Sequence, residues 1–314
     1  MDELKKRKLL KSLLRNMDES ISLKEETIAK ETILSKTDPN IKALLELLYF
    51  EEDRESSFER FCSSNEFKVM LDEIIRHANI NLNVKICEVG AGSGFFAVAL
   101  AKAGFKNVSV LEPNNEWITG TGFIANTAQK YGVRIWNSLD SWYESDELYD
   151  LIITKACVHH FDNVCKVAAE IRCKISNNGK WLMFDEFFAN STEELYSQLI
   201  NHVHASKYGQ YEWPYSTSLY IQLMQLAGYK IQEIIPMKYK NNYMIRNISY
   251  KFKLAGPFTT ITNILRYLRL TVLSFSIEKF IIDIVGHKIN LRLFTTPQLM
   301  VFGLKKMDFP ELPE

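Results

Sequence analysis

The sequence has few cysteines, and none is spaced as a disulfide framework or a zinc site requires. Its 314 residues include five cysteines, an odd number, with no CxxC pair and no Cys/His pattern of zinc-ligand spacing. A disulfide framework is therefore not expected, no metal site is expected, and a reducing cytoplasm is the expected setting.

Excess charge of one sign and long apolar runs are also missing. Thirty-eight Lys and Arg balance 38 Asp and Glu, which argues against bulk nucleic acid as the main partner. No segment reaches the roughly 18 apolar residues of a membrane-spanning helix. The first twenty residues lack the apolar core of a secretory signal. The 46% hydrophobic content predicts a globular protein with a sizeable core.

Hydrophobic periodicity divides the chain into four regions. Residues 1–80 are patterned as helices and predict an N-terminal cap, either a plain cover or a gate for substrate. Residues 81–240 alternate short apolar runs with helical segments, which predicts an α/β fold with a doubly wound parallel sheet. Residues 241–296 predict a helical insertion, and residues 297–308 the final strand of the core.

A glycine-rich turn joins the first predicted strand to its helix. Glu88 precedes Gly90, Gly92 and Gly94, and Phe95 stands where the dinucleotide fingerprint GxGxxG would place its third glycine. Glycines let a ligand approach the backbone closely, and the helix that follows directs N–H groups toward the turn. The GxGxG spacing therefore argues against a diphosphate ligand.

Two carboxylates accompany this turn. Glu112 ends the second predicted strand, 22 positions beyond Gly90, where an acid can accept hydrogen bonds from a ribose diol. Glu88 would repel a pyrophosphate but suits a ligand that carries an ammonium group. Both carboxylates fit an adenosine ligand. The alternatives are that the turn binds NAD, or that it binds no ligand and only packs the helix on the strand.

With these motifs the chain resembles the class I S-adenosylmethionine-dependent methyltransferases. Glu88 to Gly94 is similar to the family's first motif, Glu112 to its ribose-binding acid, and Asp150 to Ile153 to its fourth motif. The resemblance covers roughly residues 80–240 and 298–306. It implies a Rossmann-like sheet of seven strands whose seventh is antiparallel, and S-adenosyl-L-methionine as cofactor.

The sequence differs from the family pattern at one point. An acid often follows the third strand and contacts the adenine; here Ser138 and Leu139 occupy that position, with Asp140 next. The residues expected to bind the cofactor are Glu88, Gly90, Gly92, Gly94, Phe95, Glu112, Pro113, Ser138, Leu139, Asp140, Thr154 and Lys155.

Histidines supply the candidate bases for methyl transfer. Transfer from a sulfonium depends mainly on positioning, but a hydroxyl acceptor usually needs a base, and histidine suits neutral pH. His159 and His160 follow the fourth strand, at the sheet edge where ligands bind in doubly wound folds. Packing is the alternative role for this pair. The catalytic candidates are His160, His202 and His204.

Aromatic and acidic residues predict the acceptor pocket. Glu186 ends the fifth strand, where it either orients substrate or complements a helix N-terminus. The segment from His202 to Tyr215 is rich in aromatics, which form either a pocket wall or a core beneath a loop. The substrate candidates are Glu186, Tyr208, Tyr211, Glu212, Trp213 and Tyr215.

The insertion carries most of the local positive charge. Residues 230–292 contain eleven Lys and Arg but only three acids. This excess of positive charge is typical of a lid or oligomer contact with a solvated charged face, of a binding site for an anionic ligand, or of a helix on a membrane surface. We predict a monomer or homodimer that methylates an O or N atom of a small molecule, with anionic, sugar and natural-product acceptors as options. The alternatives are an NAD-dependent oxidoreductase and a non-catalytic nucleoside-binding module.

Overall fold

A computed structural model describes the central part of the chain. It covers residues 32–34, 36–161, 163–186, 215–236 and 297–305, together with the single residues 30, 195, 264, 267 and 268. The predicted insertion, residues 241–296, therefore lies outside the described residues except at three positions.

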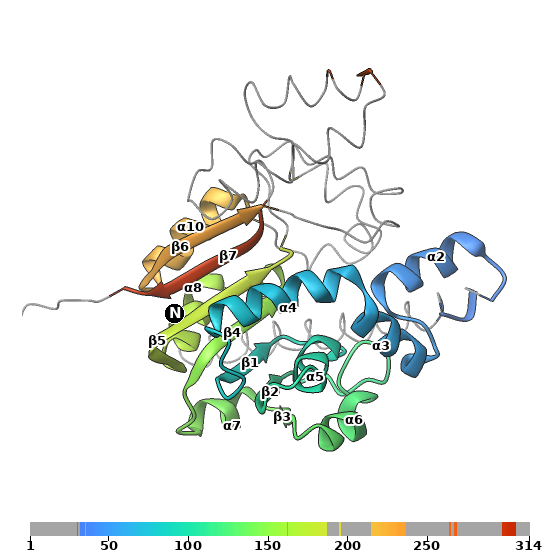
Figure 1. Ribbon diagram of the computed structural model, residues 1–314, viewed down its shortest axis with the longest axis horizontal. Coiled ribbons are helices and arrows are strands. Elements are labelled where there is room, and N and C mark those ends of the chain that lie inside the picture. Colours follow the sequence, from blue (N-terminus) through green and yellow to red (C-terminus); the bar gives the residue numbers. More distant parts are fainter. Residues whose placement is uncertain are drawn as a thin grey trace, which may run out of the picture.

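One seven-stranded sheet forms the centre of the molecule (Figure 1). Its order is β3-β2-β1-β4-β5-β7-β6, in which β1 to β5 are parallel and β7 runs antiparallel to both of its neighbours. The expected antiparallel seventh strand is thus confirmed. The strands are β1 (Lys85–Val89), β2 (Asn107–Leu111), β3 (Arg134–Trp136), β4 (Tyr149–Lys155), β5 (Ile175–Phe184), β6 (Tyr229–Pro236) and β7 (Pro297–Leu304).

Between residues 36 and 84, the helices α2, α3 and α4 precede the sheet, and each begins at a side-chain cap. The caps are Asp38 for α2 (Pro39–Leu48), Asp53 for α3 (Arg54–Ser63) and Ser64 for α4 (Asn65–His77). Each cap accepts hydrogen bonds from backbone N–H groups that the first helical turn leaves without partners. These helices lie in the region predicted as a cap; its boundary at residue 80 remains a prediction.

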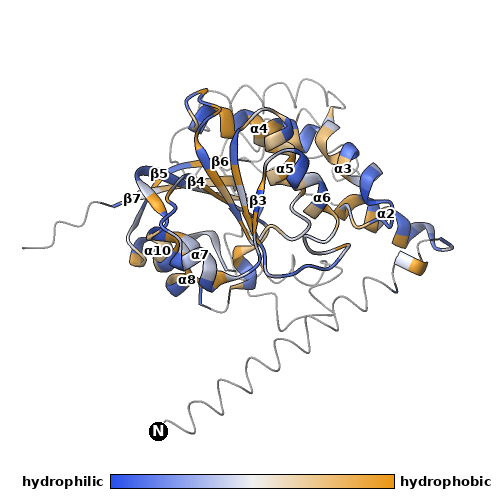
Figure 2. Ribbon diagram, turned by 90° about the horizontal axis from the view of Figure 1, so that it is seen from below, coloured by the Kyte–Doolittle hydropathy of each residue, from blue (hydrophilic) through white to orange (hydrophobic). Residues whose placement is uncertain are grey.

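The other helices with described bounds lie between the strands, as the alternating pattern predicted. They are α5 (Phe95–Lys102), α6 (Ile124–Lys130), α7 (Leu139–Glu144), η1 (Val158–His160), α8 (Val164–Arg172) and α10 (Thr217–Leu226). Figure 2 shows α4, α5 and α6 on one side of the sheet and α7, α8 and α10 on the other. Crossovers between parallel strands place α5 to α8 and α10 on the two faces, whereas α4 precedes β1.

The central strands are buried on both faces and feed two hydrophobic clusters. Along β4, Leu151 and Ile153 pack into the cluster beneath α4 and α5, while Ile152 packs into the cluster beneath α8 and α10. Successive strand side chains point to opposite faces, so a run without polar residues fills both layers. The prediction that short apolar runs such as DLIIT form strands is therefore confirmed for β4.

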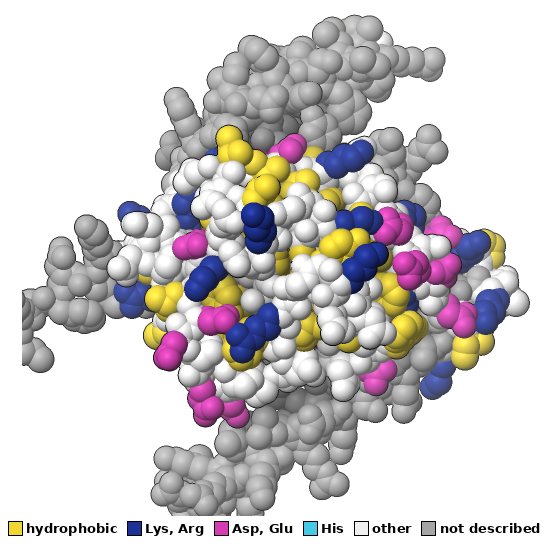
Figure 3. All heavy atoms as spheres, turned by 60° about the horizontal axis from the view of Figure 1, so that its bottom comes forward, with side chains coloured by type: hydrophobic (Ala, Val, Ile, Leu, Met, Phe, Trp, Pro, Cys, Tyr) yellow, Lys and Arg dark blue, Asp and Glu magenta, His cyan; other side chains and the backbone are white. Residues whose placement is uncertain are grey.

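The described surface is mixed in charge. In Figure 3, basic and acidic side chains are interspersed on the face shown, in keeping with the equal totals of the sequence. Within the described ranges, no helix combines the length and apolarity needed to cross a bilayer.

Candidate functional site

The glycine turn lies at the carboxyl end of β1, the central strand of the parallel part of the sheet. Gly90, Gly92 and Gly94 all have positive φ, at 65°, 52° and 66°. The turn from Gly90 to Ser93 is partly exposed, whereas Gly94 and the start of α5 are buried. The turn therefore presents backbone to solvent at the sheet edge where ligands bind in this kind of fold.

Two of the glycines are also required by packing. A Cβ on Gly90 would overlap the thiol sulfur of Cys157, and a Cβ on Gly94 would overlap the side chain of Ile124. At Gly92 the nearest atom is the Thr119 carbonyl oxygen, 3.4 Å from where a Cβ would lie. Close ligand approach was the predicted reason for glycine here; at Gly90 and Gly94 the protein's own side chains supply a second one.

Glu112 lies directly beyond β2 and holds the glycine turn. Its Oε2 accepts a 2.7 Å hydrogen bond from the Gly92 N–H, and its Oε1 accepts a 2.9 Å bond from the Asn114 N–H. Glu112 is partly exposed, and Pro113 next to it is exposed. The predicted ribose acid thus stands beside the predicted cofactor turn and links it to the loop after β2.

Glu88 is buried beneath the turn, at 3% exposure. Its Oε2 accepts a 2.8 Å hydrogen bond from the Ala97 N–H, inside the first turn of α5. Burial raises the pKa of this carboxyl to about 8, and the nearby Glu112 adds to the rise, while the Ala97 N–H and Lys155 oppose it. A cation close to Glu88 would therefore gain from its ionisation.

The residues after β3 are exposed. Ser138 caps α7 by accepting a hydrogen bond from the Ser141 N–H, and Asp140 lies in the first turn of that helix. Leu139 is 48% exposed. An apolar contact with a flat ring is consistent with this exposure, and the predicted adenine contact remains a prediction.

The end of β4 is held by the helices that precede the sheet. The Lys155 ammonium lies 3.0 Å from a carboxylate oxygen of Glu66, in the first turn of α4. Burial alone would lower the pKa of Lys155, but Glu66 and Asp185 raise it well above its ordinary value. The Thr154 hydroxyl is fully buried and accepts a hydrogen bond from the Trp181 indole N–H. Thr154 therefore directs its side chain into the core.

Glu186, just beyond β5, is buried and fixes the loop that carries the histidines. Its carboxylate accepts hydrogen bonds from the N–H groups of Cys157 (2.7 Å), Val158 (2.8 Å) and His159 (3.3 Å). The same carboxylate lies 2.7 Å from His159 Nδ1. Burial alone would raise the pKa of Glu186, but His159 and these backbone donors bring it below its ordinary value. Glu186 thus acts on η1 in this structure.

The two adjacent histidines have different surroundings. His159 is buried at 4% exposure and His160 is partly exposed, with their ring centroids 4.1 Å apart. An ionised Glu186 makes His159 Nδ1 the hydrogen donor, which leaves its Nε2 as the basic nitrogen. Of the pair, His160 is therefore the more exposed residue.

Only part of the predicted acceptor pocket can be placed. Tyr215 packs edge-on against Tyr220, with ring centroids 5.4 Å apart. Tyr220 is buried, and the charge of Glu186 helps to raise its pKa, so the start of α10 lies near the end of β5. The remaining candidates lie outside the described residues: His202, His204, Tyr208, Tyr211, Glu212 and Trp213.

Three residues at this edge were not predicted from the sequence. Glu66 and Arg54 come from the helices before the sheet, and Cys157 packs its thiol against Gly90. No local motif marks them, because each meets its neighbours only through tertiary folding. The adjacency of Cys157 to the His159–His160 pair was the one available signal.

The residues present fit S-adenosylmethionine. The open glycine turn offers backbone close to a ligand, and Glu112 can accept hydroxyl donors beside it. A cationic group bound close to Glu88 would lower the raised pKa of that carboxyl and favour its ionised form. Among the described residues, no group of three or more His, Cys, Asp or Glu is arranged to hold a metal ion.

Sequence comparison finds relatives of the same kind. The chain is 32% identical over 115 residues to a ubiquinone biosynthesis O-methyltransferase of Rickettsia canadensis (strain McKiel), covering 35% of this chain and 46% of that protein. The corresponding protein of Rickettsia felis is 31% identical over 113 residues, covering 35% and 44%. The chain therefore matches less than half of the length of these curated relatives.

Solved structures with a similar arrangement were also found. The YcgJ protein of Bacillus subtilis has a TM-score of 0.46 at 18% identity, covering 76% of this chain and 99% of that one. Magnesium protoporphyrin IX methyltransferase of Synechocystis PCC 6803, solved with S-adenosylhomocysteine, has a TM-score of 0.39 at 13% identity, covering 56% and 77%.

A family match decides the assignment. The methyltransferase domain family matches residues 50–234, more than half of the chain, and this range includes the glycine turn, Glu112 and η1. The cofactor of such domains is S-adenosylmethionine, in agreement with the residues at the edge of the sheet. The chain belongs to the class I S-adenosylmethionine-dependent methyltransferases.

Proposed function

We propose that this protein transfers a methyl group from S-adenosylmethionine to an oxygen or nitrogen atom of a small molecule. The observation that carries the proposal is the pairing of Glu112 with the glycine turn, 2.7 Å apart at the carboxyl edge of β1 and β2. A ribose above the turn would meet this carboxylate, and the methyl group would then lie toward the ends of β4 and β5.

Oxygen is the favoured acceptor atom. The partial matches to ubiquinone biosynthesis O-methyltransferases support it, and so does a histidine-bearing loop at the end of β4. A hydroxyl acceptor must lose its proton as it is methylated, so a nearby imidazole lowers the barrier. A neutral amine loses its proton more easily after transfer and depends less on such a base.

His160 is the proposed base among the described residues. It is partly exposed, and its ring rests on the buried His159, which Glu186 holds at 2.7 Å. Glu186 would then be a positioning residue, because its carboxylate serves η1 and His159. His202 and His204 stay candidates for the same role.

Binding and catalysis are tested separately. Calorimetry of the whole chain should show S-adenosylhomocysteine binding, and Glu112→Ala should weaken it by about 1–3 kcal/mol, as for a hydrogen bond lost to a charged group. Unchanged affinity in that variant would contradict the ribose assignment. NADH binding of similar strength would favour the oxidoreductase alternative.

The acceptor itself requires a screen. We would incubate the protein with methyl-labelled cofactor and a library of phenols, catechols and amines, and then repeat the reaction with His160→Asn, His202→Asn and His204→Asn. The base should show a large loss of kcat with unchanged affinity for S-adenosylhomocysteine. Full rates in all three variants would remove these histidines as bases, and binding without any transfer would support the non-catalytic alternative.

A further inference from the structure

A charged lysine ends β4, just before the loop that carries the candidate base. Lys155 lies on the same face of β4 as Leu151 and Ile153, which pack beneath α4 and α5, and its side chain extends toward α4. The Lys155 side chain is 26% exposed, so part of it meets solvent at the sheet edge. The proposed base, His160, follows five positions later in the chain. Lys155 therefore lies at the edge where the methyl group would be transferred.

The ammonium of Lys155 is held in place and kept charged. It lies 3.0 Å from a carboxylate oxygen of Glu66, whose side chain is 14% exposed. Burial alone would lower the pKa of Lys155, but the charges of Glu66 and Asp185 raise it well above its ordinary value. Lys155 is therefore a cation throughout the neutral range and cannot act as a base. An ammonium has three N–H donors, so the contact with Glu66 leaves capacity for a further acceptor.

The backbone around Lys155 adopts an uncommon conformation at three positions. Ala156, the next residue, has φ 46°, Asp185 at the end of β5 has φ 51°, and Tyr49 after α2 has φ 57°. Positive φ is unfavourable for a residue with a Cβ, and such residues cluster at functional sites. Ala156 adjoins Lys155 in the chain, and the other two interact with its charge. Strain gathered about one cation favours a functional role over a purely structural one.

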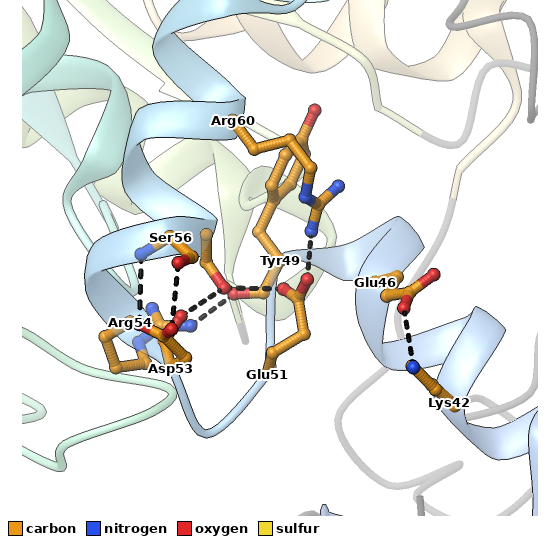
Figure 4. A network of polar contacts seen from close by, with 9 residues as sticks. Lys42, Glu46, Tyr49, Glu51, Asp53, Arg54, Ser56 and Arg60 are labelled. Atoms are coloured by element: carbon orange, nitrogen blue, oxygen red, sulfur yellow. Dashed lines mark hydrogen bonds and ion pairs between the residues drawn. The ribbon is translucent and has the colours of Figure 1, made fainter.

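Tyr49 shows how this cation acts on a phenol. In Figure 4, the ring of Tyr49 lies beside Arg60, and its phenol end points away from Glu51. Burial and the charge of Glu66 raise the pKa of Tyr49, and the Lys155 ammonium is among the groups that oppose this rise. An ammonium favours the ionised form of a phenol because opposite charges attract. The same field would act on a phenol that binds beside Lys155 from solvent.

We propose that Lys155 binds the reacting oxygen of the acceptor and stabilises it as an oxyanion, so that the acceptor is a phenol. The inference rests on the proposed function, because it needs a methyl donor at this edge. It assigns to the acceptor a residue that the sequence predicts as a cofactor contact. The phenol gives its proton to His160 while Lys155 holds the oxygen. The oxygen then bonds to the methyl carbon as the carbon–sulfur bond breaks, and the electron pair of that bond stays on sulfur.

The test follows the ionisation of a bound phenol by its colour. The whole chain, saturated with S-adenosylhomocysteine, would be titrated with 4-nitrophenol, whose phenolate absorbs visible light, and absorbance would be recorded at several pH values. In wild type, the acid dissociation constant of the bound phenol should be at least about 10-fold larger than that of the free phenol, the effect of one nearby cation. In Lys155→Met, it should fall to within about 2-fold of the free value or below it.

Lys102→Met is the matched control. Lys102 also pairs with a glutamate of the helices before the sheet, Glu59 of α3, but it lies at the end of α5, and its removal should leave the constant unchanged. Lys155→Arg keeps the charge and should retain most of the increase. Glu66→Gln removes a negative charge beside Lys155 and should enlarge the increase. If the thermal midpoint shows that Lys155→Met does not fold, Glu66→Gln/Lys155→Met, which removes both charges of the pair, gives the same comparison.

Several results would overturn the inference. An unchanged dissociation constant for the phenol bound to wild type would do so without any variant, and so would an increase that survives the loss of Lys155. If wild type bound S-adenosylhomocysteine but not 4-nitrophenol, the phenol class would be wrong while methyl transfer to another acceptor would remain the proposed function. If wild type bound neither, the proposed function itself would be contradicted, and the role of Lys155 would be lost with it.

Discussion

The two halves of the sheet edge each use a carboxylate to hold a loop, but with different consequences. At the ends of β1 and β2, Glu112 is partly exposed and accepts from two backbone N–H groups of different loops. At the ends of β4 and β5, Glu186 is buried and engages three backbone N–H groups and one imidazole. The first carboxylate remains accessible to a ligand, whereas the second maintains the loop that the ligand would meet.

The largest expected effect follows from removing the buried carboxylate. Glu186→Ala should lower the free energy of unfolding by about 3–5 kcal/mol, because the donors of η1 lose their common acceptor in a buried place. Urea denaturation would measure the loss. Glu112→Ala is the comparison, since its partly exposed partners can bond to water instead. Equal losses in the two variants would break the distinction drawn between the two halves.

Gly90 joins the two halves through its contact with Cys157. Gly90→Ala should cost about 3 kcal/mol, of which about 1–2 kcal/mol comes from the positive φ and the rest from overlap with the thiol. Gly132→Ala is the matched control, because Gly132 has φ 70° and no atom within 4 Å of where a Cβ would lie. Denaturation curves should show the smaller loss at Gly132, and Cys157→Ala should restore part of the loss at Gly90. Similar losses at both glycines would show that packing against Cys157 is unimportant.

The buried acids of the two halves should respond to pH in opposite directions. Glu88 has a raised pKa of about 8, so its protonated form stabilises the fold and that stability is lost as the pH rises toward 8. Between about pH 5 and 7 the loss should be about 2.5 kcal/mol, because the slope approaches about 1.4 kcal/mol per pH unit above the pKa of the unfolded state. For Glu186, with a lowered pKa, the stability is lost as the pH falls below its ordinary range.

Glu88→Gln provides the measurement. Unfolding followed at several pH values should show a flatter profile between about pH 5 and 7 in this variant than in wild type, because the amide does not titrate. Glu147→Gln, which changes a partly exposed acid away from the turn, should keep the wild-type profile. A profile unchanged by Glu88→Gln would show that the buried acid is not responsible for the slope.

The smallest expected effect on stability is at Glu112. Glu112→Gln should change the free energy of unfolding by about 1 kcal/mol or less, because its amide oxygen can still accept one of the two backbone bonds. Its affinity for S-adenosylhomocysteine should nevertheless fall, which thermal-shift measurements with and without that ligand would show. A large loss of stability without a loss of affinity would make Glu112 a structural residue like Glu186.

Much of the fold could be predicted because its signals are local. Runs such as VKICEVG and DLIIT are short, apolar and bounded by turn residues, and they form β1 and β4. Caps such as Asp38 and Ser64 lie next to the helices that they begin. The antiparallel β7 followed from the family resemblance, since its pairing with β5 depends on residues more than a hundred positions away.

The site was only partly predictable. Glu88, the glycines and Glu112 were found because their spacing along the chain carries the chemistry. For Glu186, the sequence indicated its position but left two roles open. Its four hydrogen bonds, to Cys157, Val158 and His159, depend on how β4 and β5 pair. Arg54 carried no signal, because an arginine at the start of a polar helix is ordinary until the fold buries it.

By itself, the sequence determined the order of strands and helices and the position of the cofactor turn, because these depend on residues close together in the chain. Only the tertiary structure decided which carboxylate faces a ligand and which holds a loop. Burial and hydrogen-bond partners set that difference, and both arise from segments that meet across the sheet edge: Glu112 with Gly92, Glu186 with His159, and Arg54 with Phe95.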